Sequence, residues 1–136
     1  MKNVRSSAWF LVAIITCLLF LSCKNELSSS SDFLIRVDSV RAPLSVSSGT
    51  SFDVEFFGTV GYDECNSFKT FNKVNNNNKI IIEAWGTYDK TDGTCLPGLV
   101  LLDGQKLNLT IEFPGTYNIV IKEPENFVII RQITVN

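Results

Sequence analysis

The chain has 136 residues, of which 19% are charged, and its formal net charge is −2. It contains no histidine, which excludes Ser-His-Asp and Cys-His catalysis and removes the commonest metal ligand. It also has no basic run or basic face, so we expect no nucleic-acid partner. The glycines are scattered at turn positions instead of forming a phosphate-binding loop. We therefore expect a protein that is not an enzyme, with no catalytic residue, no cofactor and no metal.

The N-terminus combines a basic start with a short apolar run. Lys2 and Arg5 precede Ala8–Leu21, a stretch of 14 residues, whereas a membrane-spanning helix needs about 20. Such a segment is typical of an export signal that is removed. It ends at Ser22-Cys23, and a polar, serine-rich stretch follows. This arrangement resembles the signal peptide of a bacterial lipoprotein, in particular the looser Bacteroidetes type. An ordinary signal peptide with an incidental cysteine, or a short uncleaved anchor, is the alternative.

The resemblance implies a membrane anchor at the start of the mature chain. In lipoproteins the equivalent of Cys23 carries a diacylglyceryl group, and two acyl chains hold a protein stably on a membrane. Lys24 is not acidic, which favours the outer membrane and leaves its periplasmic face or the cell surface open. We expect a signal peptide helix in residues 1–22, a flexible serine-rich tether in residues 23–32, and one domain in residues 33–136.

The remaining cysteines form one pair. Loss of residues 1–22 removes Lys2 and Arg5, which changes the net charge from −2 to −4, and leaves 114 residues, enough for one domain. Cys65 and Cys95 are then an even pair in an oxidising compartment, which predicts a disulfide. A metal site is the alternative, but two thiols without histidine make a poor zinc site.

The rest of the chain alternates β-branched or aromatic residues with polar ones, which is typical of strands. Asn75–Asn78 suits a hairpin turn, because asparagine tolerates positive φ. We expect loops at Gly58–Cys65 and at Asp89–Gly98. The strands that we expect are Phe33–Val40, Phe52–Phe56, Phe68–Val74, Lys79–Tyr88, Leu99–Leu102, Leu107–Phe113, Tyr117–Ile121 and Phe127–Val135. Pro43 breaks the first of these, and Leu44–Val46 is a candidate segment that rejoins a sheet edge.

A short motif near the C-terminus narrows the fold. Phe113-Pro114-Gly115-Thr116-Tyr117 resembles the turn before strand F of immunoglobulin-like and fibronectin type III domains, where a tyrosine hydroxyl bonds back to the preceding corner. A plain Pro-Gly turn is the alternative. We expect an all-β protein, a single antiparallel immunoglobulin-like β-sandwich of seven to eight strands, with Tyr117, Pro114 and Gly115 forming the structural corner.

Three aromatic residues are candidates for contact with a ligand. Trp85 and Tyr88 are three positions apart, which places them on opposite faces of a strand. We expect Trp85 in the core, with a ligand-facing position as the alternative, and Tyr62 and Tyr88 at the surface near loops.

A protein-interaction module at the cell envelope is our first hypothesis, and a carbohydrate-binding lipoprotein of a glycan-uptake system is the second. The third is a protease inhibitor of the chagasin type, which Gly58–Tyr62 weakly resembles, or a small hydrolase.

Overall fold

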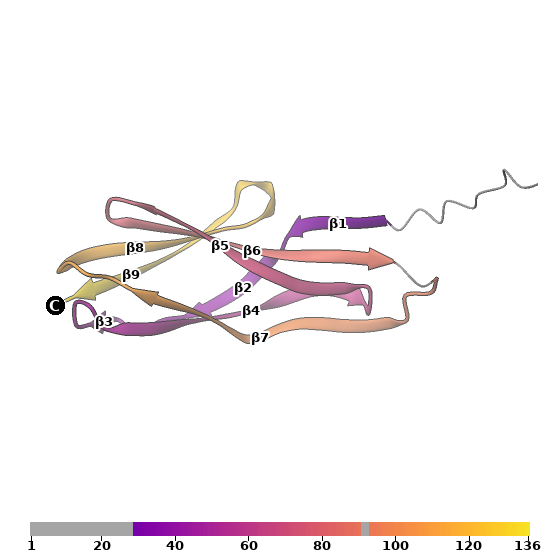
Figure 1. Ribbon diagram of the computed structural model, residues 1–136, viewed down its shortest axis with the longest axis horizontal. Coiled ribbons are helices and arrows are strands. Elements are labelled where there is room, and N and C mark those ends of the chain that lie inside the picture. The colour runs from indigo at the N-terminus through magenta and orange to yellow at the C-terminus, as the bar shows by residue number, and fades with distance from the viewer. Residues whose placement is uncertain (1–28, 91–92) are drawn as a thin grey trace, which may run out of the picture.

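The computed structural model describes residues 29–90 and 93–136, which form two stacked β-sheets (Figure 1). The predicted signal peptide helix and the lipidation site Cys23 lie outside these residues. The described elements are β1 (Ser29–Leu34), β2 (Arg36–Arg41), β3 (Ser45–Val46), β4 (Ser51–Asp63), β5 (Asn66–Asn76), β6 (Lys79–Lys90), β7 (Pro97–Thr110), β8 (Gly115–Lys122), β9 (Val128–Val135) and the short 3₁₀ turn η1 (Pro124–Asn126).

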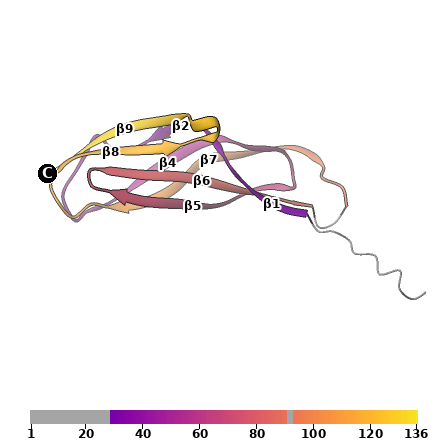
Figure 2. The ribbon, with the colours of Figure 1, turned by 90° about the horizontal axis from the view of Figure 1, so that it is seen from above.

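The larger sheet, sheet A, contains β5, β6, β1, β8, β9 and β3, and the smaller one, sheet B, has the order β2-β4-β7. Figure 2 looks onto sheet A and shows β5, β6, β8 and β9 side by side. Strand β6 has β5 along one edge, while β8 and β1 share its other edge, β8 at Lys79–Glu83 and β1 from Trp85 onward. Sheet A therefore contains both parallel and antiparallel pairs.

Alternating side chains of the two sheets form one core. In β4 every second residue from Phe52 to Val60 is buried, and in β6 the same holds from Ile80 to Gly86. The Phe56 ring, which has no exposed surface, lies 4.5 Å from the Phe71 ring between centroids. Aromatic pairs at this spacing add stability beyond the area that they bury. The core therefore joins sheet B to β5 and β6 of sheet A.

The corner predicted at Tyr117 is present. The Tyr117 hydroxyl donates a hydrogen bond to the carbonyl oxygen of Phe113, at 3.1 Å. Gly115 has φ of 150°, a conformation that residues with a side chain rarely adopt. Asn77 likewise has φ of 51° in the β5–β6 turn, as the Asn75–Asn78 tract predicted. Both turns thus follow from local sequence.

The structure corrects the predicted strand count and direction. There are nine strands in the described residues, not seven or eight, and sheet A is mixed because β8 pairs with β6 in parallel, as β3 does with β9. The expected strand Phe33–Val40 is split, since the chain crosses from sheet A to sheet B at Ile35. Alternation has the same period in parallel and antiparallel strands, so the sequence pattern carries no information on direction.

Two predicted boundaries also differ. The expected loop at Gly58–Cys65 continues β4 up to Asp63. A Cβ atom on Gly58 would lie 2.6 Å from the backbone oxygen of Arg36, so this glycine serves the close approach of β2 and does not mark a turn. Strand β1 begins at Ser29 and is antiparallel to β6, with Ser29 opposite Lys90 and Leu34 opposite Trp85. Four residues of the expected tether, 29–32, therefore belong to sheet A.

A third boundary concerns β7. The strand that we expected at Leu99–Leu102 and the first four residues of the one expected at Leu107–Phe113 are parts of this single strand, which ends at Thr110. They meet at a bulge, where Gly104 has φ of 72°, a conformation that glycine adopts readily.

Candidate binding surfaces

The predicted disulfide is present at one end of the two sheets. Cys65 and Cys95 are bonded, with their Cα atoms 5.4 Å apart, and the bridge joins the β4–β5 turn to the segment before β7. Asp63 lies close enough to both sulfur atoms for the three residues to resemble a metal cluster. Sulfur atoms that are joined in a disulfide are not thiolate ligands, so the bridge accounts for this cluster.

Hydrogen bonds hold the turn beside the bridge. One carboxylate oxygen of Asp63 accepts from the backbone N–H of Cys65 at 3.1 Å and from Asn66 Nδ2 at 2.7 Å. The backbone N–H of Asp89 donates to the carbonyl of Cys65 at 2.9 Å. An aspartate that bonds to the backbone two residues later is a common way to stabilise a turn. The end of the molecule that carries the disulfide is therefore well braced.

An open pocket of about 720 Å³ lies beside this braced turn. We call it the disulfide-end pocket; its polar and aromatic lining is Arg36, Asp38, Tyr62, Asp63, Asn66 and Tyr88. Tyr62 is 77% exposed, and the hydroxyl of Tyr88 lies 3.4 Å from the Cys95 sulfur. The structure thus brings together Tyr62 and Tyr88, the two tyrosines that the sequence predicted at the surface near loops. It also places Arg36 and Asp38 in the pocket lining, which the sequence did not predict because both lie within an expected strand. The arrangement suits a small polar ligand.

Trp85 lies on the outer face of sheet A, not in the core. It is half-buried, whereas its neighbours Ala84 and Gly86 point inward and are buried. Its indole N–H donates to a Glu83 carboxylate oxygen at 3.2 Å. The expectation of a core tryptophan was wrong because the core positions of β6 are the even-numbered ones, Ile80 to Gly86, and Trp85 has the opposite parity. Trp85 and Tyr88 do lie on different faces, as predicted.

A shallow hollow of about 370 Å³ adjoins Trp85 on this face. Lys69 Nζ lies 2.5 Å from a carboxylate oxygen of Asp32, and both residues line the hollow. The hydrogen bond from Lys69 holds the pKa of the Asp32 carboxyl below its ordinary value. Both groups are exposed and paired with each other, so they give the hollow a polar rim.

A row of apolar side chains crosses the same outer face. Val74 pairs with Ile81, Ile81 with Val120, and Val120 with Ile130, so these residues of β5, β6, β8 and β9 are direct neighbours on one face. Val74 is 59% exposed and Ile130 is 55% exposed. We call these four residues the apolar row. Sequence reasoning missed it, because Ile81 stands between two core isoleucines, and the cross-strand register that aligns the row is a tertiary feature.

Mainly polar residues border the apolar row; the exception, Val128, pairs with Lys122 and is 51% exposed. Lys79, Asn118 and Gln132 form the next row in one direction. In the other direction Lys122 Nζ lies 3.4 Å from the Glu83 carboxylate, so the two charges offset each other. An apolar centre with a polar border is the arrangement found in protein–protein interfaces.

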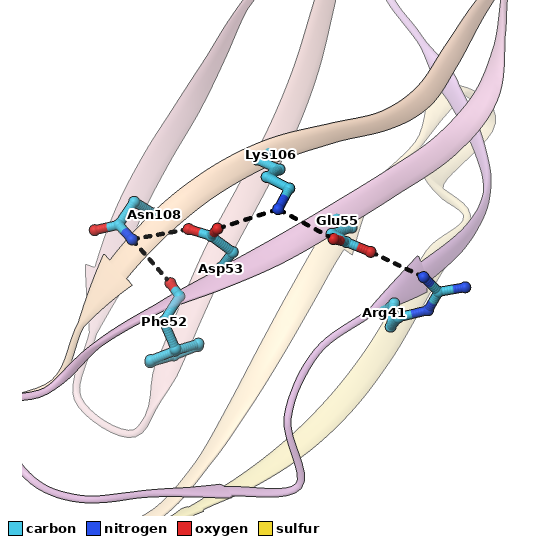
Figure 3. Close-up of polar contacts among 6 residues, drawn as sticks. All are labelled: Arg41, Phe52, Asp53, Glu55, Lys106 and Asn108. Atoms are coloured by element: carbon cyan, nitrogen blue, oxygen red, sulfur yellow. Dashed lines mark hydrogen bonds and ion pairs between the residues drawn. The ribbon is translucent and has the colours of Figure 1, made fainter.

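The half of the outer face of sheet B around Lys106 is polar by comparison (Figure 3). Lys106 Nζ lies 3.5 Å from Asp53 and 3.4 Å from Glu55, and Arg41 lies 3.1 Å from the other oxygen of Glu55. Asn108 donates to Asp53 at 2.8 Å, and this bond together with Lys106 keeps the pKa of the Asp53 carboxyl below its ordinary value. Glu55 and then Asp53 raise the pKa of Lys106. This half of the face is a set of mutually satisfied charges.

Comparisons with known proteins identify no relative: no family model, no curated protein and no solved structure matches the chain. In residues 29–90 and 93–136 no helix is long and apolar enough to cross a membrane. Gly58–Tyr62, which weakly resembled an inhibitor loop, is part of strand β4. What is established is a small all-β domain with two sheets in a sandwich-like arrangement and one disulfide.

Proposed function

We propose that this chain is a non-catalytic, lipid-anchored protein of the bacterial envelope, and that it binds a protein partner through the outer face of sheet A. The observation that supports this most is the apolar row of Val74, Ile81, Val120 and Ile130. An antiparallel sheet face that only meets water usually carries polar residues at such positions. Apolar side chains that gather on a sheet face, and have a polar border, favour an interaction surface.

The dimensions of the row fit a protein partner. It crosses four adjacent strands, which is three strand spacings or about 14 Å. Its members are all valine or isoleucine, whose side chains have few rotamers to lose when a partner docks. With the Glu83–Lys122 pair beside it, the row carries no net charge. We therefore expect the partner to present an apolar, uncharged ridge of similar length.

The predicted anchor leaves this face accessible. Six residue steps separate Cys23 from Ser29, the start of β1, and an extended chain of that length spans at most about 20 Å. Ser29 pairs with Lys90 at the disulfide end of β6. Ile81 is nine positions back along β6, about 30 Å away at the usual rise of a strand. An anchor on Cys23 would thus hold the disulfide end near the membrane and the apolar row away from it.

A carbohydrate ligand in the disulfide-end pocket is the second candidate. The supporting observation is that Tyr62 and Tyr88 line one pocket together with Arg36, Asp38 and Asn66. Aromatic rings with a few polar groups at fixed positions are typical of small-ligand sites. A glycan array tests this candidate: binding that is lost in Tyr62→Ala and Tyr88→Ala would support it, and no binding by the unaltered protein would leave it without support.

Site-specific photo-cross-linking in the native envelope tests the protein-binding proposal. A photoreactive residue at Ile130 should form an adduct of defined mass, and one at Phe113, which is 75% exposed and lies in the turn before β8, outside the row, should not. Excess soluble unaltered domain should compete the adduct away, while the same domain carrying Ile130→Asp should not. Equal labelling from both positions, or equal competition by both domains, would contradict the proposal.

Mass spectrometry of the purified protein tests the anchor separately. Lipidation predicts a mature N-terminus at Cys23 that carries acyl chains. An unmodified Cys23, or a retained Met1, would show that the chain is not a lipoprotein, whatever the outcome for the apolar row.

A further inference from the structure

Strand β7 is an edge strand of sheet B with an unusual first half. It pairs with β4 on one side and with no strand on the other among the described residues. Pro97–Leu102 contains no charged residue. Leu99 is 60% exposed and Leu101 is 51% exposed. An apolar edge of this kind is a ready template for pairing with another strand.

Two of the other edges, β5 and β2, carry the features that normally prevent such pairing. Strand β5, the edge of sheet A, has Lys69 and Lys73 and an irregularity between Phe68 and Thr70. Strand β2, the opposite edge of sheet B, begins with Arg36 and ends with Arg41. Charged side chains and bulges on an edge discourage strand addition. The first half of β7 carries no charge up to Leu102, although its register with β4 also shifts, between Thr59 and Gly61 and between Gly61 and Asp63.

The second half of β7 is interrupted in the same protective way. Gly104 has φ of 72°, and the register between β4 and β7 shifts next to it, between Phe56 and Phe57. Lys106 follows, engaged by Asp53 and Glu55. A bulge bends the strand and ends regular pairing at that point. The segment available for pairing is therefore Pro97–Asp103.

We propose that a second copy of this chain pairs antiparallel with Pro97–Asp103 about a two-fold axis at Val100. The segment is complementary to itself in this register. Leu99 of each copy then lies opposite Leu101 of the other on the exposed face, which gives two leucine pairs. Val100 of one copy lies opposite Val100 of the other. Directly opposed residues share a face and are in contact in an antiparallel pair, so the four exposed leucines form one cluster. A symmetric contact of this kind gives a closed dimer.

Charge supports the same register. Asp103 of each copy lies opposite Pro97 of the other, so no like charges face each other. Pro97 has no N–H to donate, which suits the end of the paired segment. Seven paired residues bury much less surface than a standard interface, so the dimer is weak and reversible. Attachment of both copies to one membrane would raise their effective concentration.

Analytical ultracentrifugation over a concentration series tests the proposal on the full chain. We expect a monomer–dimer equilibrium. The double substitution Leu99→Lys with Leu101→Lys sets two pairs of like charges opposite each other and should weaken the dimer by about tenfold or more. The control, Leu44→Lys with Phe113→Lys, makes the same charge change at positions 85% and 75% exposed and should leave the dimer unchanged. A monomer at all concentrations, or equal weakening by both variants, would overturn the proposal.

Disulfide trapping tests the register independently of any loss of folding. Cys17 and Cys23 are replaced by serine in every sample. Cys65 and Cys95 are bonded to each other, so the introduced cysteine is the only free thiol of each chain. A mixture of Leu99→Cys chains and Leu101→Cys chains should form a cross-linked dimer faster than either variant alone, because these positions face each other. Cross-linking that is no faster in the mixture than in the separate samples would contradict the two-fold register.

Discussion

Removal of the Cys65–Cys95 bridge should lower the free energy of unfolding by an amount that follows from the length of the loop that the bridge closes. The bridge closes a loop with a sequence separation of 30 residues. On the chain-entropy model this restriction of the unfolded state is worth about 3.6 kcal/mol at 25 °C. The double variant Cys65→Ala with Cys95→Ala should therefore lose about this much free energy of unfolding. For a domain of this size, that corresponds to a fall in Tm of about 15 °C.

Urea unfolding of the two proteins measures the difference, with circular dichroism as the probe. The slope of the transition should rise in the variant, since its unfolded state is less compact and exposes more surface. The folded variant should keep the spectrum of the unaltered protein, because the core from Phe52 to Ile133 does not include the cysteines. A loss below about 1 kcal/mol would refute the entropic reasoning, as it would mean that the unfolded chain is already restricted.

Three further substitutions have defined outcomes. Tyr117→Phe removes the hydrogen bond to Phe113 and keeps the ring, so thermal denaturation should show a loss of about 1 kcal/mol; unchanged stability would mean that the corner does not depend on this bond. Gly58→Ala places a Cβ 2.6 Å from a backbone oxygen and should cost about 1–3 kcal/mol in urea unfolding, and an equally stable variant would contradict the close approach of β2. Asp53→Asn should lower stability at neutral pH but not at strongly acidic pH. A carboxyl whose pKa is lowered in the folded state stabilises the fold at pH values above its unfolded pKa, and this stabilisation is lost as the pH falls through the folded pKa. A stability difference between the two proteins that stays constant across this pH range would exclude the carboxylate as its source.

The strand content and turns of this domain were largely readable from the sequence because they depend on local chemistry. Phe52, Val54 and Phe56 alternate with polar residues, and this alternation alone defines the buried face of β4. Asn77 and Gly115 occupy positive φ at turns, where asparagine and glycine are the residues expected. The disulfide followed from the number of cysteines and from the oxidising compartment that the N-terminal pattern predicts. These features need no knowledge of which strands are neighbours.

The features that were missed all depend on strand neighbours. Trp85 was placed in the core because it ends an apolar run, but it lies between Leu34 of β1 and Thr70 of β5 on the outer face of sheet A. Strand β8 is parallel to β6 because the chain crosses to sheet B and back, through β7, between them. The alternation of apolar and polar residues is the same for either strand direction, so the sequence pattern does not reveal this crossover. The disulfide-end pocket combines Arg36 with Tyr62 because the chain leaves sheet A after β1 and enters sheet B as β2, beside β4. Each of these is a tertiary property of the chain.

The affinity of the cross-linked partner is the most direct test of the claim that the apolar row is an interface. Once the partner captured at Ile130 is identified and purified, isothermal titration calorimetry can compare the unaltered protein with Ile130→Asp and with Phe113→Asp. Burial of one isoleucine is worth about 1.5–3 kcal/mol, so Ile130→Asp should weaken binding at least about tenfold, and Phe113→Asp should leave it unchanged. Equal affinities for all three proteins would contradict the assignment of the outer face of sheet A as the binding surface.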